Sequence, residues 1–170
     1  MIILLFFSSI LEEISEKLKE VRAIECNFTE ILIVKGDTLK FRGSVYAEKK
    51  RARIDVYKPE RQIMIFINDS IFLWTEKTNQ VFRRKAPIIF YNVLFSPNLN
   101  YKIDSTSSGW IYLSPLKDEL IYPISVLLNK DLLPKKIRFA QEEGSGVFTF
   151  SSYKLNKKYP EGFFSLDKMN

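Results

Sequence analysis

The sequence contains no histidine and only one cysteine, Cys26. The absence of histidine removes the commonest general base, the Ser-His and Cys-His nucleophile pairs, and most zinc sites. A single cysteine cannot form a disulfide within the chain, so cysteine usage does not indicate a cellular compartment. The six glycines form neither a G-x-x-x-x-G-K-S/T phosphate loop nor a G-x-G-x-x-G dinucleotide motif.

Catalysis by carboxylates alone is the arrangement that this composition leaves open. The acidic residues do not favour it, because they stand singly at turns or wet strand positions, or side by side in one turn: Asp55, Glu60, Asp69, Glu76, Asp104, Glu119, Glu142, Glu143 and Glu161. Cys26 lies at the start of an expected strand and is interpreted as a small buried side chain rather than a nucleophile. We therefore interpret the chain as a non-enzymatic protein that needs no cofactor and no metal.

What is present is a globular, aromatic-rich and basic composition. The 170 residues are 46% apolar and 14% aromatic, which predicts one domain with a substantial core. Twenty-six Lys and Arg against 20 Asp and Glu give a net charge of +6. This charge fits nucleic acid, an anionic membrane surface or an acidic protein partner, and equally a solvated basic surface with no partner.

The amino terminus, MIILLFFSSI, is apolar but too short to span a bilayer. It is similar to the hydrophobic region of a secretory signal, although no Lys or Arg precedes it and no A-x-A-like cleavage site follows. We predict a short or truncated export signal over residues 1–9, followed by a single domain over residues 10–170. The alternative is that these residues are the buried start of the first helix.

A helix is predicted from Ser9 to Ala23. Ser9 and Glu12 have the spacing of a capping box, in which each side chain satisfies a backbone N–H of the first turn. One apolar stripe at helical spacing should face the core: Ile10, Leu11, Ile14, Leu18 and Val21.

From Cys26 onward the hydrophobic period changes to two, which predicts strands. The expected strands are Asn27–Val34, Thr38–Ala47, Arg51–Tyr57, Gln62–Ile67, Ile71–Thr75, Gln80–Arg84, Tyr101–Asp104, Trp110–Leu113, Leu120–Leu128, Lys136–Gln141, Val147–Tyr153 and Phe163–Leu166. This pattern predicts a mainly β (α+β) fold: a strongly curved antiparallel sheet or incomplete β-barrel, with helices over its concave face.

The strand Gln62–Ile67 is unusual because Ile63 to Ile67 are apolar at odd and even positions alike. Side chains alternate between the two faces of a sheet, so both faces of this strand should be hidden from water. Either it is a central strand covered on both sides, or one of its faces lines an apolar cavity.

Residues 85–100 break the strand pattern. The stretch is strongly apolar, is bounded by Pro87 and Pro97, and has room for about three helical turns. We interpret it as short lid helices over the sheet, with ordinary core as the alternative.

Two ordered blocks of residues resemble the periplasmic outer-membrane lipoprotein carrier family (LolA). The first contains Pro59-Glu60, an aliphatic run, Asn68-Asp69, Leu73-Trp74 and Gln80-Val81. The second contains Leu133-Pro134, Ile137, Thr149-Phe150-Ser151, Lys154-Leu155-Asn156, Pro160 and Phe163-Phe164. Together the blocks span most of residues 26–167.

The resemblance implies a periplasmic, monomeric chaperone without nucleic acid among its partners. Its partners would be acylated lipoproteins, an inner-membrane lipoprotein-releasing transporter and an outer-membrane lipoprotein acceptor. Acyl chains would bind at apolar residues of the central strands and of the lid: Ile63, Ile65, Phe66, Ile67, Phe72, Trp74, Ile88, Ile89, Phe90, Val93, Leu94 and Phe95.

The resemblance also implies a cargo-release site in the basic turn after Ala47. The family commonly has Lys-Arg-Pro there, whereas this chain has Glu48-Lys49-Lys50-Arg51, which is one residue shorter and lacks the proline. The release arginine therefore aligns with either Lys49 or Lys50, and Arg53 matches a second family arginine.

Three alternatives remain. Two are relatives of the same fold, namely a lipoprotein-sensing regulator and an outer-membrane lipoprotein receptor. The receptor is anchored through a cysteine directly after its signal, and Cys26 instead follows a charged helix. The third is a basic β-rich nucleic-acid-binding domain, in which basic runs such as Lys49–Arg51 and Arg83–Lys85 would act beside exposed aromatics.

Overall fold

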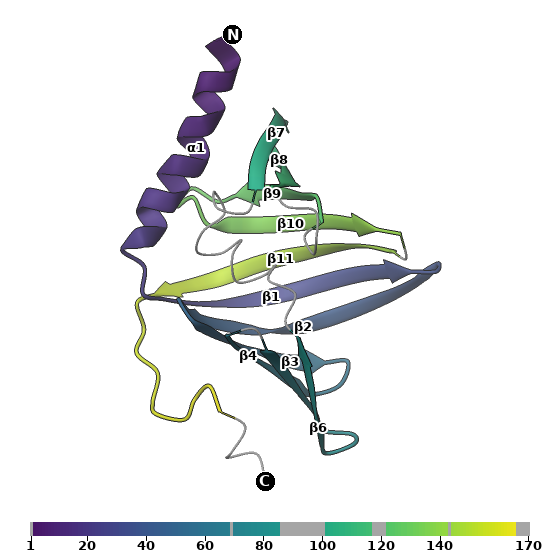
Figure 1. The fold of residues 1–170 in the computed structure, drawn as a ribbon. Helices are drawn as coiled ribbons and strands as arrows, with labels where there is room; N and C mark the ends of the chain where they lie inside the picture. The colour runs from purple at the N-terminus through teal and green to yellow at the C-terminus, as the bar shows by residue number, and fades with distance from the viewer. Residues whose placement is uncertain (1, 69, 86–100, 117–121, 143, 166–170) are drawn as a thin grey trace.

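The fold is one continuous antiparallel sheet of eleven strands with a single helix among the residues described (Figure 1). The computed structural model describes residues 2–68, 70–85, 101–116, 122–142 and 144–165, and for residues 2–9 the backbone alone. The elements are α1 (Ile2–Lys19), β1 (Ala23–Val34), β2 (Asp37–Glu48), β3 (Arg51–Lys58), β4 (Gln62–Ile67), β5 (Ser70–Thr75), β6 (Gln80–Lys85), β7 (Tyr101–Ser107), β8 (Trp110–Pro115), β9 (Ile124–Leu128), β10 (Pro134–Gln141) and β11 (Gly144–Leu155).

The strand order is β6-β5-β4-β3-β2-β1-β11-β10-β9-β8-β7, with every neighbouring pair antiparallel. The first and last strands of the chain thus meet at the centre, and β6 and β7 form the two edges. One core cluster joins Ile54 of β3 to Leu113 of β8, on opposite arms of the sheet. Since flat sheets cannot bring such distant strands to one core, the sheet is strongly curled. The predicted fold class, an incomplete β-barrel, is confirmed.

The two faces of the sheet follow from the register. Residues opposite each other in adjacent strands share a face, so the pairs Cys26↔Val45, Val45↔Ile54 and Ile54↔Met64 all lie on one side. This side also carries the sheet residues that pack with the helix, and we call it the inner face. The outer face carries the alternate residues, such as Tyr46 and Arg53.

The helix begins earlier and ends earlier than its sequence pattern predicts. α1 starts at Ile2, so Ser9 lies inside the helix and the predicted capping box is wrong. The apolar residues before Ser9 include no helix breaker, and the helical backbone continues through them. α1 ends at Lys19 because Ala23 already pairs with Glu48 in the β1–β2 ladder.

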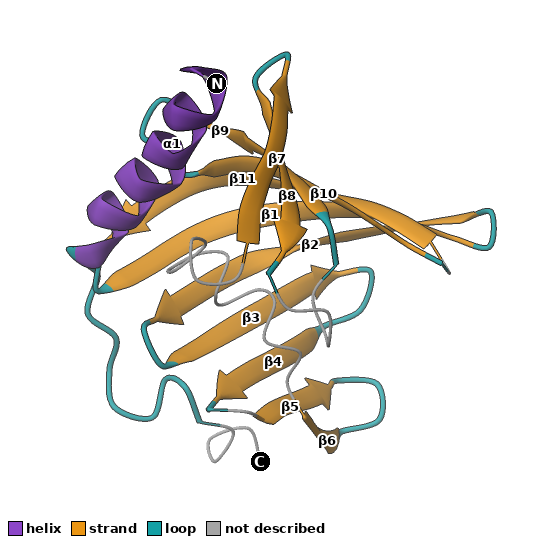
Figure 2. Cartoon of the chain, turned by 45° about the horizontal axis from the view of Figure 1, so that its top comes forward, coloured by secondary structure: helices purple, strands orange, loops and turns teal. Residues whose placement is uncertain are grey.

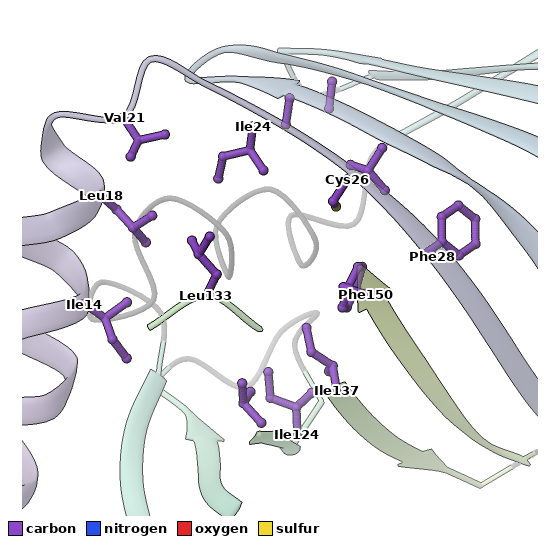
Figure 3. Packing of buried hydrophobic residues seen from close by; sticks show 14 of the residues in the cluster. Ile14, Leu18, Val21, Ile24, Cys26, Phe28, Ile124, Leu133, Ile137 and Phe150 are labelled. Atoms are coloured by element: carbon purple, nitrogen blue, oxygen red, sulfur yellow. The ribbon is translucent and has the colours of Figure 1, made fainter. Parts of the chain in front are cut away.

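The predicted apolar stripe of the helix is confirmed. Leu11, Ile14, Leu18 and Val21 are buried among sheet residues, and Ile10 packs against the same cluster. Figure 3 shows Ile14, Leu18 and Val21 directed toward Ile24, Leu133 and Ile124. Figure 2 shows α1 at the end of the sheet where β1 begins and β11 ends. The core therefore lies between the helix and the curled inner face.

Other boundaries also differ from the predictions. β9 begins at Ile124, after Pro123, which cannot donate a hydrogen bond to a ladder. β11 begins at Gly144, three residues before the predicted strand Val147–Tyr153. Leu39, an apolar residue of the predicted strand Thr38–Ala47, is 43% exposed because the β1–β2 hairpin extends beyond the core.

The predicted closing strand Phe163–Leu166 is wrong. Residues 161–164 form turns, and the segment 156–165, which we call the C-terminal strap, lies against the outer face without joining a ladder. The strap leaves the sheet beside the end of α1 and passes β2 and β3 (Figures 1 and 2). Backbone contacts fix its start: Asn156 N–H donates to the Ala23 carbonyl at 2.8 Å, and its Oδ1 accepts from Arg22 N–H at 2.7 Å.

Candidate ligand cavity

The inner face contains an apolar cavity of about 260 Å³ between the centre of the sheet and strand β5. Its lining comes from six strands: Phe28, Glu30, Phe41, Val45, Ile54, Val56, Gln62, Met64, Phe66, Ile71 and Phe148. The register explains this set, since it places all of these residues on the inner face of the sheet. The cavity therefore results from the curl of the sheet rather than from one motif.

Aromatic rings form the wall at the centre of the sheet. The ring centroids of Phe28 and Phe148 lie 6.1 Å apart, and Phe148 stacks on Phe150 at 6.0 Å. Phe139 lies 5.8 Å from Phe148 on the other side. Aromatic pairs at these separations are mutually attractive and resist displacement. The opposite wall, formed by Met64, Phe66 and Ile71, is only half-buried and has more freedom to adapt to a ligand.

Two polar side chains interrupt this apolar lining. Glu30 comes from β1 and Gln62 from β4. Burial raises the pKa of the Glu30 carboxyl to about 7. An apolar pocket with a few placed polar groups is the usual form of a small-ligand site.

The structure separates the sequence-predicted cavity residues of β4 and β5 by face. Phe66 lines the cavity. The other predicted residues of these two strands lie on the outer face: Ile63, Ile65, Ile67, Phe72 and Trp74. Strand β4 is thus hidden on both faces, but by different partners. The inner face of β4 borders the cavity, and the outer face lies beneath the C-terminal strap.

The outer cover of β4 is an aromatic and cationic cluster. Ile63 and Ile65 are 3% and 1% exposed, and Ile63 lies beside Arg53 and Phe163 in a surface groove. Tyr46, Tyr159 and Phe163 pack with ring centroids 4.8 to 5.9 Å apart. This cluster explains why odd positions of β4 are apolar without facing the cavity.

Arg53 holds the strap against the sheet. Its guanidinium makes two hydrogen bonds to Asp55, of 2.7 and 3.1 Å, donates to the Phe163 carbonyl at 3.0 Å, and lies 4.8 Å from the centre of the Phe163 ring. Lys49 and Lys50 occupy the turn between β2 and β3. Lys49 Nζ donates to the Lys19 carbonyl at the end of α1, at 3.0 Å, while Lys50 is exposed. The three predicted release residues are therefore near in sequence but have different surroundings.

The remaining predicted site residues, Ile88, Ile89, Phe90, Val93, Leu94 and Phe95, lie outside the described residues. Met64, Ile71 and Glu30 line the cavity and were missed by the sequence reasoning. Met64 and Ile71 could have been found from the sequence. Met64 is two residues from Phe66 on the same strand, and Ile71 pairs with Phe66 across the turn, so all three share a face. Glu30 had none, since an acidic residue in an alternating strand is ordinarily solvated.

Cys26 is a buried residue, as its sequence context indicates. Its side chain has no exposed surface, and burial raises the pKa of the thiol to about 12. The protonated thiol is a poor nucleophile, so the environment of Cys26 does not favour covalent chemistry.

An open, curled antiparallel sheet with one helix on its inner face defines the class of incomplete β-barrels. A LolA superfamily protein from Nitrosomonas europaea superposes with a TM-score of 0.55 at 12% identity, covering 91% of this chain and 97% of that one. A putative outer membrane lipoprotein-sorting protein domain from Vibrio parahaemolyticus gives 0.56 at 12% identity, covering 92% and 95%. The Pseudomonas aeruginosa MucA/MucB complex contains a chain that gives 0.50 at 13% identity, covering 92% and 59%.

The chain therefore has a LolA-like fold. No family model matches the sequence, and no curated protein matches it. The described part of the chain holds no helix long and apolar enough to cross a membrane. Across the same residues, no group of three or more His, Cys, Asp or Glu side chains is placed to hold a metal ion.

Proposed function

We propose that this protein binds the acyl chains of lipoproteins in its inner-face cavity and carries them through the periplasm. It would receive them from an inner-membrane lipoprotein-releasing transporter and deliver them to an outer-membrane acceptor. The observation that carries the proposal is the apolar cavity on the inner face of a LolA-like fold. The direction of transport follows from the sequence resemblance, and the likeness to a lipoprotein-sorting domain supports it.

The cavity suits cargo that must later be released. Each buried methylene contributes about 0.8 kcal/mol, so an acyl chain with ten buried carbons gains about 8 kcal/mol. A carrier needs a competing term of similar size, because otherwise the cargo would not leave. Residues of the empty protein that close onto the cavity supply such a term, since the cargo must displace their apolar contacts.

Adjacent residues of β5 allow a matched test of where cargo binds. Ile71 lines the cavity and Phe72 has outer-face parity, and both side chains are half-buried. Ile71→Asp should weaken binding of a diacylated peptide at least tenfold, because a charge in the cavity disfavours the acyl chain. Phe72→Asp should leave the affinity within twofold. Isothermal titration calorimetry measures both, and circular dichroism confirms that both variants are folded.

Failure of wild-type protein to bind the diacylated peptide would contradict the proposed function. Stronger weakening by Phe72→Asp than by Ile71→Asp would instead move the site to the outer face, among the predicted residues Ile63, Ile65, Phe72 and Trp74. Trp74 donates its indole N–H to Asn79 Oδ1 at 3.1 Å on that face, so its fluorescence should change little when the inner cavity is filled.

We also propose that residues 88–95 act as a lid. Their many large apolar side chains need a surface to cover, and the cavity is an apolar surface of suitable kind. Cysteines at Phe90 and Ile71 should form a disulfide that blocks binding of the diacylated peptide until it is reduced. Cys26 needs no replacement because it is buried. Equal binding by the locked and reduced proteins would show that the segment is ordinary core.

Cargo release is proposed to depend on Lys49 or Lys50. Each is tested singly as a Leu variant by measuring transfer of a bound lipopeptide to acceptor vesicles. Slower transfer in one variant, with unchanged binding, would identify the release residue. Unchanged transfer in both variants would remove this assignment.

A lipoprotein-sensing regulator of the same fold is the second candidate. Such a regulator would bind a protein partner, and a chain of the two-protein MucA/MucB complex shares this fold. A regulator would retain lipopeptide when acceptor vesicles are added, whereas a carrier would deliver it. The same transfer assay on wild-type protein therefore separates the two functions.

A further inference from the structure

Glu30 is the single carboxyl among the residues that line the cavity. It lies on β1 directly opposite Phe41 of β2 on one side and Phe148 of β11 on the other. All three residues have inner-face parity and contribute to the same cavity wall. The carboxyl therefore meets any ligand that enters the cavity at its central, aromatic end.

The Glu30 carboxyl has no polar partner among the described residues. They supply it with neither a hydrogen bond nor an ion pair. Its described inner-face neighbours on β1, β2 and β11 are all uncharged: Phe28, Leu32, Leu39, Phe41, Gly43, Gly146, Phe148 and Phe150. Burial in these apolar surroundings raises the pKa of Glu30 to about 7. A polar group in such a place disfavours the empty state and becomes favourable once a partner arrives.

Gln62, on β4, is the other polar residue of the lining and lies toward the opposite wall of the cavity. The strand order places β2 and β3 between β1 and β4, so Glu30 and Gln62 are separated by about 14 Å across the sheet, at about 4.8 Å per strand. The lining between them is apolar: Val45, Ile54, Val56 and Met64. The cavity thus has a carboxyl at its central end and an amide group across an apolar stretch, which orients an elongated ligand.

We infer that the cavity selects acyl ligands that carry an N–H donor beside the chain, and that Glu30 accepts this hydrogen bond. An acyl amide fits the arrangement, because its N–H can reach the carboxylate while its chain extends along the apolar middle toward Gln62. An ester of the same length has only oxygen lone pairs at that position and leaves the carboxylate unpaired. This inference rests on the proposed function, since it assigns chemistry to the same cavity.

The test compares two probes that differ in one group. N-ethyldodecanamide and ethyl dodecanoate have the same chain and differ by N–H against oxygen. Their affinities are measured by competition with the neutral fluorophore N-phenyl-1-naphthylamine at pH 8.5, where Glu30 is ionised. Wild-type protein should prefer the amide about tenfold, the size expected for one hydrogen bond to a charged acceptor. At pH 5.5 the protonated carboxyl can donate to the ester carbonyl, so the preference should fall to about threefold or less.

Three variants identify the residue responsible. Glu30→Leu should abolish the amide preference while both probes still bind, and Glu30→Gln should keep a preference of a few fold because its carbonyl still accepts. Thr29→Leu, at the neighbouring exposed outer-face position, should behave as wild type.

Equal binding of amide and ester by the wild-type protein would overturn this inference and leave acyl-chain binding intact. An undiminished preference in Glu30→Leu would overturn it as well. Failure of folded wild-type protein to bind either probe would contradict the proposed function itself.

Discussion

Three ionisable side chains on β1 have different surroundings, although they lie within six residues of one another. Glu25 accepts hydrogen bonds from Lys157 at 2.7 Å and Lys154 at 2.9 Å, and these contacts lower the pKa of its carboxyl. Burial instead raises the pKa of Glu30 to about 7 and that of Cys26 to about 12. The alternation of side chains along the strand explains these opposite pKa shifts, because Glu25 lies on the outer face whereas Cys26 and Glu30 lie on the inner face.

The first residue-scale prediction concerns Glu30 and pH. Its folded-state pKa of about 7 lies above the ordinary value of 4.5, so the native state holds the proton more tightly than the unfolded state. The resulting contribution to stability is fully present below pH 4.5 and is lost as pH rises through about 7. We expect this loss to be about 1–2 kcal/mol after allowing for solvent screening, because the carboxyl is only partly buried.

Chemical denaturation of wild type and Glu30→Gln between pH 4.5 and 8 measures this effect. The variant should show a smaller decline in the free energy of unfolding over that interval. Glu25 does not interfere, because it is unchanged in the variant and contributes equally to both curves. Parallel curves for the two proteins would show that Glu30 is solvated in the folded state.

A second residue-scale prediction concerns Gly43. The backbone of β2 at Gly43 passes so close to the Asp55 carbonyl and the Phe28 ring that an added Cβ would overlap both. Gly43→Ala should lower the free energy of unfolding by about 2–3 kcal/mol, since both the β3 backbone and the Phe28 ring must shift. Gly36→Ala is the matched control for conformation without crowding, because Gly36 has a φ of +89° and open space around it. It should cost about 1 kcal/mol. Chemical denaturation measures both variants. An equal loss in the free energy of unfolding for the two changes would contradict the crowding at Gly43.

At the scale of elements, the C-terminal strap is the part whose role differs most from its sequence pattern. Phe163–Leu166 is predicted as a strand, but the aromatic residues of the strap pack on the outer face against Tyr46, Arg51 and Arg53. Phe164 is 3% exposed beneath this cover. Strand β4 needs such a cover because Ile63 and Ile65 are apolar on that face.

The strap provides the element-scale prediction. Arg53→Met should remove the hydrogen bonds to Asp55 and to the Phe163 carbonyl, and leave Asp55 without its partner. Both side chains of this ion pair are only 16% exposed, so we expect a loss of about 1–3 kcal/mol. Faster amide hydrogen exchange in residues 156–165 should accompany it.

Lys50→Met is the control for this experiment, because Lys50 is an exposed cation in the adjacent turn. It should change the free energy of unfolding by less than about 0.5 kcal/mol. If Arg53→Met slows lipopeptide transfer while stability and strap exchange stay unchanged, Arg53 acts in release rather than in holding the strap.

At the scale of the whole molecule, the core depends on the curl of the sheet. Residues from β3 and from β8, which lie near opposite edges of the strand order, join the helix in one cluster. The cavity lies on the same inner face, beside this cluster. A carrier function additionally needs export of the whole chain. Contacts within the fold do not test export.

The whole-molecule prediction is therefore that the protein is exported. Fractionation of cells should recover it from the periplasm, with its apolar amino-terminal residues removed. Mass spectrometry of the recovered protein measures the cleavage point. Protein found solely in the cytoplasm with an intact amino terminus would remove the carrier proposal, and the binding of acyl chains would then need another physiological role.

Much of the fold could be predicted from sequence because it depends on local periodicity. Ala52, Ile54 and Val56 alternate with polar residues and are buried, and Leu11, Ile14 and Leu18 recur at helical spacing and face the core. Alternation between faces is a property of the extended backbone itself, and the helical stripe is a property of 3.6 residues per turn. These features of the protein were determined by the sequence alone.

The tertiary structure decided which face of each strand has which role. The apolar residues of β4 are equivalent in sequence, yet Phe66 lines the cavity whereas Ile65 lies on the outer face that the strap covers. Nothing local distinguishes them, because the difference arises from the direction of curl and from a segment that returns about 100 residues later along the chain. The β1–β2 hairpin and the long-range pairing of β1 with β11 place Phe41 and Phe148 beside Glu30, which turns an ordinary strand carboxylate into a partly buried one.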